Sequence, residues 1–240
     1  MKTADETGKP LVVAQARRSV YEMLSGLFLE LPDRNMVSSI FDPDFGRRLS
    51  MVASVFEAGE IREGLALISR FISSFRNDSR EEILKRISID RTRLFRGVSE
   101  KQSPPPPYES FYREQRLSGQ TSADVYRFYC RLGVTLPEGW TESPDYLGVE
   151  IDFMRLLCQG EEEAWLNHQP EKALEFLRTS GDFLKDHLLK WAPSFFEKMV
   201  EMAGLDFYRG LARLTNGFLR VDLRLVEEQL EAVSHTPEKS

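Results

Sequence analysis

The chain has few of the residues that build metal and redox sites. Its 240 residues include two cysteines, Cys130 and Cys158, and three histidines, His168, His187 and His235. No two histidines are spaced to share one face of a helix, so a metal site is not expected. Both cysteines fall within apolar helical patterns, which predicts two buried, reduced thiols instead of a disulfide or a metal pair.

Catalytic motifs and long apolar runs are also missing. The sequence contains no nucleophile elbow, phosphate-binding loop or dinucleotide fingerprint. No segment approaches the roughly 20 apolar residues that cross a bilayer, and residues 1–10 lack the apolar centre of a secretory signal. The net charge of -6 disfavours binding to nucleic acid, which requires clustered cations. We therefore expect a cytoplasmic protein that is not an enzyme and has no membrane span.

Helical periodicity dominates what is present. Val13, Ala16, Val20, Met23 and Leu27 recur at steps of three or four and form one apolar stripe. A second stripe runs through residues 61–75, and strand-like alternation of useful length is missing. The pattern predicts an all-α protein of roughly ten helices.

Capping residues predict several helix ends in the first part of the chain. Asp42 precedes Pro43, the arrangement of an N-cap followed by proline at the first helical position, and this helix is predicted to run to Gly59. Ser79 and Glu82 have the spacing of a capping box.

The second part of the chain carries similar signals. Ser122 is a predicted N-cap for a helix that Gly133 ends, and Ser143 is a predicted N-cap with Pro144 at the first helical position. Further helices are predicted from Pro170 through Phe183, from Pro193 after a break at Trp191, and from Asp206 to Val233.

A proline-rich segment interrupts the helical pattern. Pro104 to Pro107 are four consecutive prolines, which donate no backbone hydrogen bonds and hold the preceding residues extended. Residues 99–107 are therefore a predicted connector between an N-terminal helical half, 11–98, and a C-terminal helical half, 108–233, with a loose tail at 234–240. Such a connector suits either a monomer or a domain-swapped dimer.

Two carboxylates after the connector are candidates for function. Asp145 is expected in the first turn of a helix, where it either caps free N–H groups or contributes charge to a site. Glu150 lies in an apolar run and is expected to be partly buried, which requires a donor or a cation. Its predicted partner is either an internal arginine, Arg93 or Arg96, or a basic peptide.

Aromatic residues follow the prolines. Tyr108 and Tyr112 are at i and i+4, so a helix that begins near Pro107 would place both on one face. They are expected either to pack the two halves together or to line a groove for a peptide.

Three sequence elements in a fixed order resemble a known family. The first is Leu-Phe-x-Gly, the second is Pro-Tyr-x-Ser-x-Tyr, and the third is Pro-Asp-x-x-x-x-Glu-x-x-Phe-Met. Together with the segments 21–28 and 183–193, they resemble the redox-enzyme maturation chaperones that include TorD, DmsD and NarJ, over nearly the whole chain. Tyr146 stands where that family often has histidine. Tyrosine cannot become a cation near neutral pH, but it can still form hydrogen bonds or stack.

The resemblance implies a cytoplasmic, all-α chaperone without a cofactor. Such a protein binds the twin-arginine signal peptide and the apo form of a molybdopterin oxidoreductase catalytic subunit, and delays export until the cofactor is inserted. The peptide groove is expected between the two halves, with Asp145 and Glu150 facing the arginines of the signal. The predicted peptide-binding residues are Leu94, Phe95, Gly97, Pro107, Tyr108, Ser110, Tyr112, Pro144, Asp145, Tyr146 and Glu150.

Two other functions fit the same pattern. One is a helical protein or enzyme that binds a small ligand, such as a nucleotide or a pterin, in the same cleft. The other is a structural adaptor in which side chains fill the space between the halves. The identity of the client oxidoreductase does not follow from the sequence.

Overall fold

The computed structural model of the chain describes residues 4–96, 103–135 and 141–234. Within these residues the protein is helical, with no strand and one isolated antiparallel bridge between Tyr108 and Tyr146, so the all-α prediction is confirmed. The elements are α1 (Ala4–Leu29), α2 (Arg34–Ile40), α3 (Pro43–Val55), α4 (Gly59–Ser74), α5 (Arg80–Arg96), α6 (Glu109–Glu114), α7 (Gln120–Arg131), α8 (Leu147–Leu166), α9 (Pro170–Phe183), the π-helical segment η1 (Leu184–Leu188), α10 (Leu189–Met202) and α11 (Asp206–Ser234).

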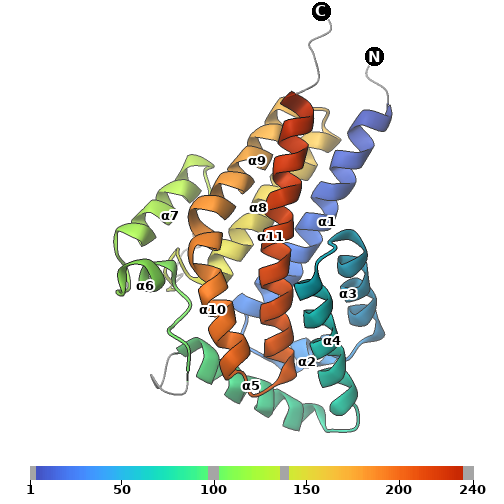
Figure 1. Cartoon of the computed structure of the whole chain (residues 1–240), viewed down its shortest axis with the longest axis vertical. Helices are drawn as coiled ribbons and strands as arrows, with labels where there is room; N and C mark the ends of the chain where they lie inside the picture. Colours follow the sequence, from blue (N-terminus) through green and yellow to red (C-terminus); the bar gives the residue numbers. More distant parts are fainter. Residues whose placement is uncertain (1–3, 97–102, 136–140, 235–240) are drawn as a thin grey trace, which may run out of the picture.

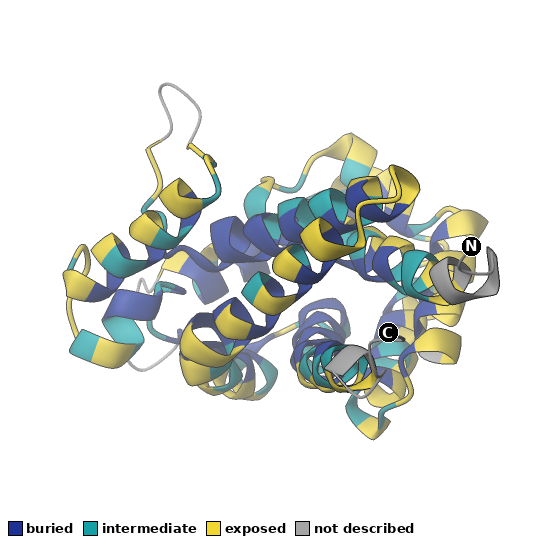
Figure 2. Cartoon of the chain, turned by 90° about the horizontal axis from the view of Figure 1, so that it is seen from above, coloured by how far each residue is buried: buried dark blue, intermediate teal, exposed yellow. Residues whose placement is uncertain are grey.

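Long helices from distant parts of the sequence form the body of the molecule. Helix α1 packs along α8, α4 packs along α11, and α9 and α10 complete the bundle (Figure 1). Viewed from above, the outer helices turn a buried stripe inward and an exposed face outward (Figure 2), whereas α8 is buried or half-buried over most of its length. No described helix has the length and apolarity needed to cross a membrane.

One apolar core extends across the proline segment. The ring centroid of Phe28 in α1 lies 6.0 Å from that of Phe196 in α10. Phe95 in α5 lies 5.8 Å from Phe195 in α10. Apolar side chains from before and after the prolines share this core, so the two predicted halves pack directly against each other.

Glycines allow the close contact between α4 and α11. A Cβ atom on Gly64 would lie 2.6 Å from the carbonyl oxygen of Gly210 and 2.6 Å from the amide nitrogen of Leu214. Backbone atoms cannot yield as a flexible side chain can, so the two helices can approach this closely only with glycine at the contact.

A buried ionic cluster joins three of the long helices. The Arg17 side chain of α1 is 0% exposed and donates to Asp222 of α11 and Glu161 of α8, each at 2.5 Å. The hydroxyl of Tyr21 donates to the second oxygen of Asp222 at 2.6 Å. Charges buried this deeply are stable only when they are paired, so the cluster fixes how α1, α8 and α11 meet.

Several predicted helix ends are confirmed. The side chain of Asp42 accepts the amide of Asp44 at 2.7 Å, and Ser79 accepts the amide of Glu82 at 3.2 Å. Gly133, just beyond α7, has a positive φ of 68°, which glycine adopts without strain. The helices predicted from residues 170 and 206 begin at those residues.

Other predicted boundaries are wrong. Helix α3 ends at Val55, and Gly59 begins the next helix. Helix α7 begins before Ser122, and α8 begins four residues after Ser143. Pro193 lies inside α10 instead of starting a helix, because η1 and α10 follow each other without a break.

The two cysteines differ in their surroundings. Cys158 is buried, as predicted, and burial raises the pKa of its thiol above the usual range. Cys130 is exposed, so the prediction of a buried thiol is wrong there. It follows the buried Tyr129 by one residue, and this step turns its side chain about 100° away from the core.

Candidate functional site

The second and third sequence elements lie side by side in the structure. The amide of Glu109 donates to the carbonyl of Asp145, and the amide of Leu147 donates to the carbonyl of Pro107, both at 3.0 Å. The rings of Tyr108 and Tyr146 pack with centroids 5.3 Å apart. This backbone pairing brings the start of α6 to the start of α8 and defines the candidate site.

Asp145 acts as a cap across this junction. Its side chain is fully buried, and Oδ2 accepts the backbone amide of Ser110 in α6 at 2.8 Å. The hydroxyl of Ser143 donates to Oδ1 and pairs with the hydroxyl of Ser122. The predicted position in the first turn of α8 is therefore wrong, because Asp145 satisfies a free N–H group of α6 instead.

Glu150 is buried on the first turns of α8. Its side chain is 0% exposed, and Oε2 accepts the indole N–H of Trp191 in α10 at 3.1 Å. The other oxygen, Oε1, is buried without a hydrogen-bond partner among the described residues. Neither predicted arginine reaches it, because Arg93 pairs with Asp90 and Arg96 is exposed.

A second buried carboxylate, Glu109, adds to the effect of burial on the protonation of Glu150. Glu109 is also 0% exposed and contacts Arg113 and Nδ1 of His187, the latter at 2.9 Å. Burial raises the pKa of Glu150 well above its usual range, and the negative charge of Glu109 raises it further. The site therefore favours the neutral, protonated form of Glu150.

These contacts correct the expected electrostatic role of the acidic pair. Asp145 and Glu150 are both 0% exposed. Their oxygens face Ser110, Ser143 and Trp191 inside the protein. In this conformation neither carboxylate is accessible to arginines of a bound peptide.

The first sequence element lies in the core. Leu94 is fully buried and Phe95 is 6% exposed. The Phe95 ring packs against Phe28 and Phe195, which hold α5 against α1 and α10. Gly97, the last residue of that element, lies outside the described residues.

The tyrosines divide between core and surface. Tyr112 stacks on Trp191 with centroids 5.4 Å apart, as expected for packing. Tyr108 is half-buried and donates its hydroxyl to the exposed Glu142 at 2.6 Å. Tyr146 is buried and donates to the carbonyl of Phe28 at 2.9 Å, so it forms a hydrogen bond where the resembling family often has histidine.

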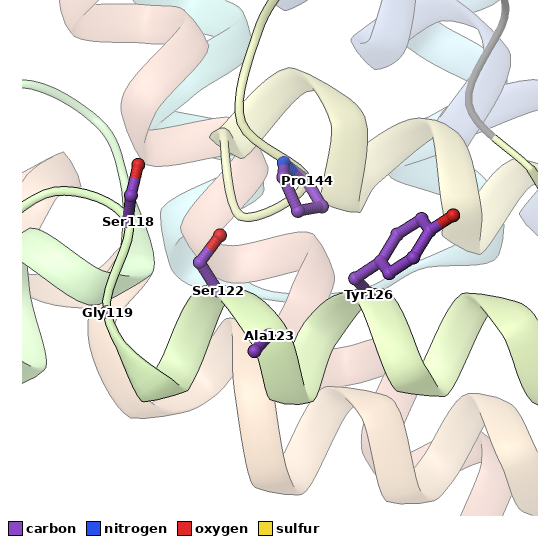
Figure 3. Close-up of a pocket in the computed structure, with 6 residues that line it drawn as sticks. All are labelled: Ser118, Gly119, Ser122, Ala123, Tyr126 and Pro144. Carbon is purple, nitrogen blue, oxygen red and sulfur yellow. The ribbon is translucent and has the colours of Figure 1, made fainter.

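An open hollow of about 500 Å³ lies beside this junction. Figure 3 shows Ala123 and Tyr126 on α7 near the loop that carries Pro144. Tyr126 is 41% exposed. Leu117, which directly precedes the lining residue Ser118 in the sequence, is 53% exposed. The lining residues are Ser118, Gly119, Ser122, Ala123, Tyr126 and Pro144. Of these, only Pro144 is among the predicted peptide-binding residues.

The sequence offered a weak signal for this hollow. Ser118 and Gly119 form a short turn-rich stretch ahead of α7, and Tyr126 interrupts the polar face of that helix. Neither feature is specific to a binding site. The described residues contain no group of three or more His, Cys, Asp or Glu side chains arranged to hold a metal ion.

Comparison with known proteins identifies the family. A sequence model of the nitrate reductase delta subunit matches residues 57–197, more than half of the chain. The chain belongs to the nitrate reductase delta subunit family. The matched region of this family member contains all three sequence elements, the buried carboxylates Glu109, Asp145 and Glu150, and the hollow.

Relatives of this nitrate reductase delta subunit family member cover nearly its full length. The chaperone protein TorD of Vibrio cholerae strain O395 is 24% identical over 226 residues, which cover 92% of this chain and 96% of the relative. The chaperone protein TorD of Shewanella pealeana is 24% identical over 236 residues, which cover 94% and 96%. The resemblance to the family that includes TorD and NarJ is therefore confirmed.

Proposed function

We propose that this protein binds the signal peptide and the apo form of a molybdopterin oxidoreductase catalytic subunit in the cytoplasm. It holds this client until the cofactor is inserted and then releases it for export or assembly. Family membership and the TorD relatives support the chaperone class. The observation that carries the binding site is the open hollow beside the junction of the second and third sequence elements.

The contacts that we propose come from the exposed edge of the junction. Tyr126 and Pro144 line the hollow and present apolar surface to a helix of the leader, a mode in which aromatic side chains dominate the affinity. Glu142 is exposed beside Tyr108, so its carboxylate is the proposed partner for a leader arginine in place of the buried pair.

The remaining residues of the predicted set would act by shaping this edge. Leu94, Phe95, Pro107, Ser110, Asp145, Tyr146 and Glu150 are buried, and Tyr112 is packed on Trp191. They hold α5, α6 and the loop before α8 in place, so their substitution would change binding together with stability. Substitutions at the exposed edge would change binding alone.

Calorimetric titration with a synthetic twin-arginine leader peptide tests the site. Tyr126→Ser should weaken binding at least tenfold, the usual effect of losing an aromatic anchor. Glu142→Gln should weaken binding less and reduce its salt dependence. Met51→Ser is the matched control, because Met51 is 66% exposed on α3 and lies outside the hollow.

Equal affinity of the wild type and Tyr126→Ser would refute the site. Equal losses of leader affinity in Tyr126→Ser and Met51→Ser would refute it as well, because they would show that the leader binds exposed apolar residues without preference for the hollow. The client would be identified by comparing leaders from several molybdopterin oxidoreductases in the same titration.

The oligomeric state and the division at the prolines stay predictions. We propose a monomer or a domain-swapped dimer that exchanges segments about the proline connector. Sedimentation of the intact chain distinguishes these two states. A swapped dimer keeps the contacts of α1 with α8 and of α4 with α11, but forms them between two chains.

A further inference from the structure

A second hollow, of about 320 Å³, is lined by α5 and by the segment that follows α1. It is at the lower end of the size range for small-molecule sites. Its described lining residues include two arginines and no carboxylate, although the whole chain has a net charge of -6. The lining residues are Leu31, Pro32, Ser88, Arg91, Thr92 and Arg96.

Arg91 is a buried cation for which the described residues supply no charge partner. Its side chain is 7% exposed, and its Nη2 donates to the backbone carbonyl of Phe28 at 2.8 Å. Its Nε–H group is buried and has no hydrogen-bond partner, and no carboxylate of the described residues forms an ion pair with it. A buried guanidinium in this situation is under-satisfied, because burial of a charge is costly unless that charge is paired.

The position of Arg91 is fixed before any ligand arrives. Its guanidinium lies over the ring of Phe95, 4.8 Å from the centroid. The hydroxyl of Tyr146 donates to the same Phe28 carbonyl, so this carbonyl accepts from both side chains. A rigid, planar guanidinium loses little freedom when it binds an oxyanion, so this arrangement is pre-organised.

The rest of the hollow adds polar and apolar walls. Ser88, Thr92 and Arg96 are at i, i+4 and i+8 of α5 and share one face. The Thr92 hydroxyl already donates to the carbonyl of Ser88, so the donors available to a ligand in addition to Arg91 are the Ser88 hydroxyl and the exposed Arg96. Leu31, which is 67% exposed, supplies an apolar rim.

We propose that this hollow binds a small-molecule oxyanion that carries an apolar group. Arg91 and Arg96 would hold the phosphate or carboxylate oxygens, the Ser88 hydroxyl would donate a further hydrogen bond, and Leu31 with Pro32 would cover the apolar part. Guanidinium groups match both oxyanions with paired hydrogen bonds. This site is separate from the proposed leader site and does not depend on it.

The test is a calorimetric titration of the full-length chain with phenyl phosphate and with benzoate, at constant ionic strength. Benzyl alcohol serves as the neutral probe. We expect one or both anions to bind and the alcohol not to bind. The oxyanion that binds more tightly, phosphate ester or carboxylate, defines the ligand class.

Substitutions of the lining residues test whether the anion binds in this hollow. Arg96→Gln should weaken the anion at least tenfold, because a charge-assisted hydrogen bond is lost. Ser88→Ala should weaken it by a smaller factor. Arg178→Gln is the matched control, since Arg178 is exposed on α9, which lies far from α5 (Figure 1). Arg96 is exposed, so Arg96→Gln should leave the thermal midpoint of the free protein unchanged.

Three results would overturn the proposal. The first is that neither anion binds the wild type, and the second is that benzyl alcohol binds as tightly as the anions. The third is that Arg178→Gln loses as much affinity as Arg96→Gln. Leader binding measured on Arg96→Gln separates the two sites, because it should remain at the wild-type level.

Discussion

Glu150→Gln should stabilise the protein by an amount that grows as the pH rises. Glu150 is fully buried beside Glu109, and burial raises its pKa well above the usual range. The unfolded chain releases this proton near the ordinary pKa of glutamate, whereas the folded chain keeps it. The folded state then binds more protons than the unfolded state, so the wild type loses stability as the pH rises between the two pKa values.

The size of the effect follows from proton linkage. One retained proton costs at most about 1.4 kcal/mol of unfolding free energy for each pH unit above the unfolded pKa. Glutamine has the shape of the protonated acid and does not titrate, so Glu150→Gln removes this slope. Its oxygen can accept the Trp191 indole N–H that now reaches Oε2 at 3.1 Å.

Urea unfolding at pH 5, 6, 7 and 8 measures the prediction. The variant should approach the wild type at pH 5 and exceed its stability progressively at higher pH. Glu163→Gln is the matched control, because Glu163 is exposed on the same helix, and its curve should follow that of the wild type. A constant offset between Glu150→Gln and wild type, or a deficit that grows with pH, would show that Glu150 is ionised in the folded protein.

Three further substitutions test the packing and the caps. Arg17→Met leaves two buried carboxylates unpaired and should cost about 3–5 kcal/mol in chemical denaturation; a loss below about 1 kcal/mol would mean that the cluster opens to water. Gly64→Ala places a Cβ 2.6 Å from backbone atoms of α11 and should cost about 1–3 kcal/mol, whereas Gly46→Ala, with nothing within 4 Å, should be neutral or stabilising in the same thermal scan. Asp145→Ala should lower the unfolding free energy by about 2 kcal/mol, which is more than the loss expected for Asp33→Ala at an exposed helix cap. Equal losses of stability in the two variants, measured by differential scanning calorimetry, would contradict the role of Asp145 across α6 and α8.

Local signals in the sequence were sufficient for many helix ends. The caps at Asp42 and Ser79 depend on residues two or three positions away, so nothing outside the segment could change them. Ser143 carries the same kind of signal and is not a cap. Its hydroxyl donates to Asp145, which is itself held by the amide of Ser110 in α6. A partner 35 positions away along the chain decided this boundary.

The candidate site shows the same division. The sequence indicated that Tyr108 and Tyr146 belong to one functional region, and the bridge between them is present. It did not show that Glu150 faces Trp191, or that Tyr126 lines the open hollow. Those facts depend on how α7, α8 and α10 are placed relative to one another, and side-chain spacing along one helix carries no information on that placement.

The sequence by itself determined the helical class, the family and most helix positions, because apolar spacing and local caps act within a few residues. Only the tertiary structure decided which polar groups are buried together and which surface is open. Long-range packing brings α1 against α8 and α4 against α11, and this packing turned the acidic residues inward and left Tyr126 and Arg96 at the surface. The free energy of burying charge depends on the partners that the fold supplies, and a single helix cannot specify them.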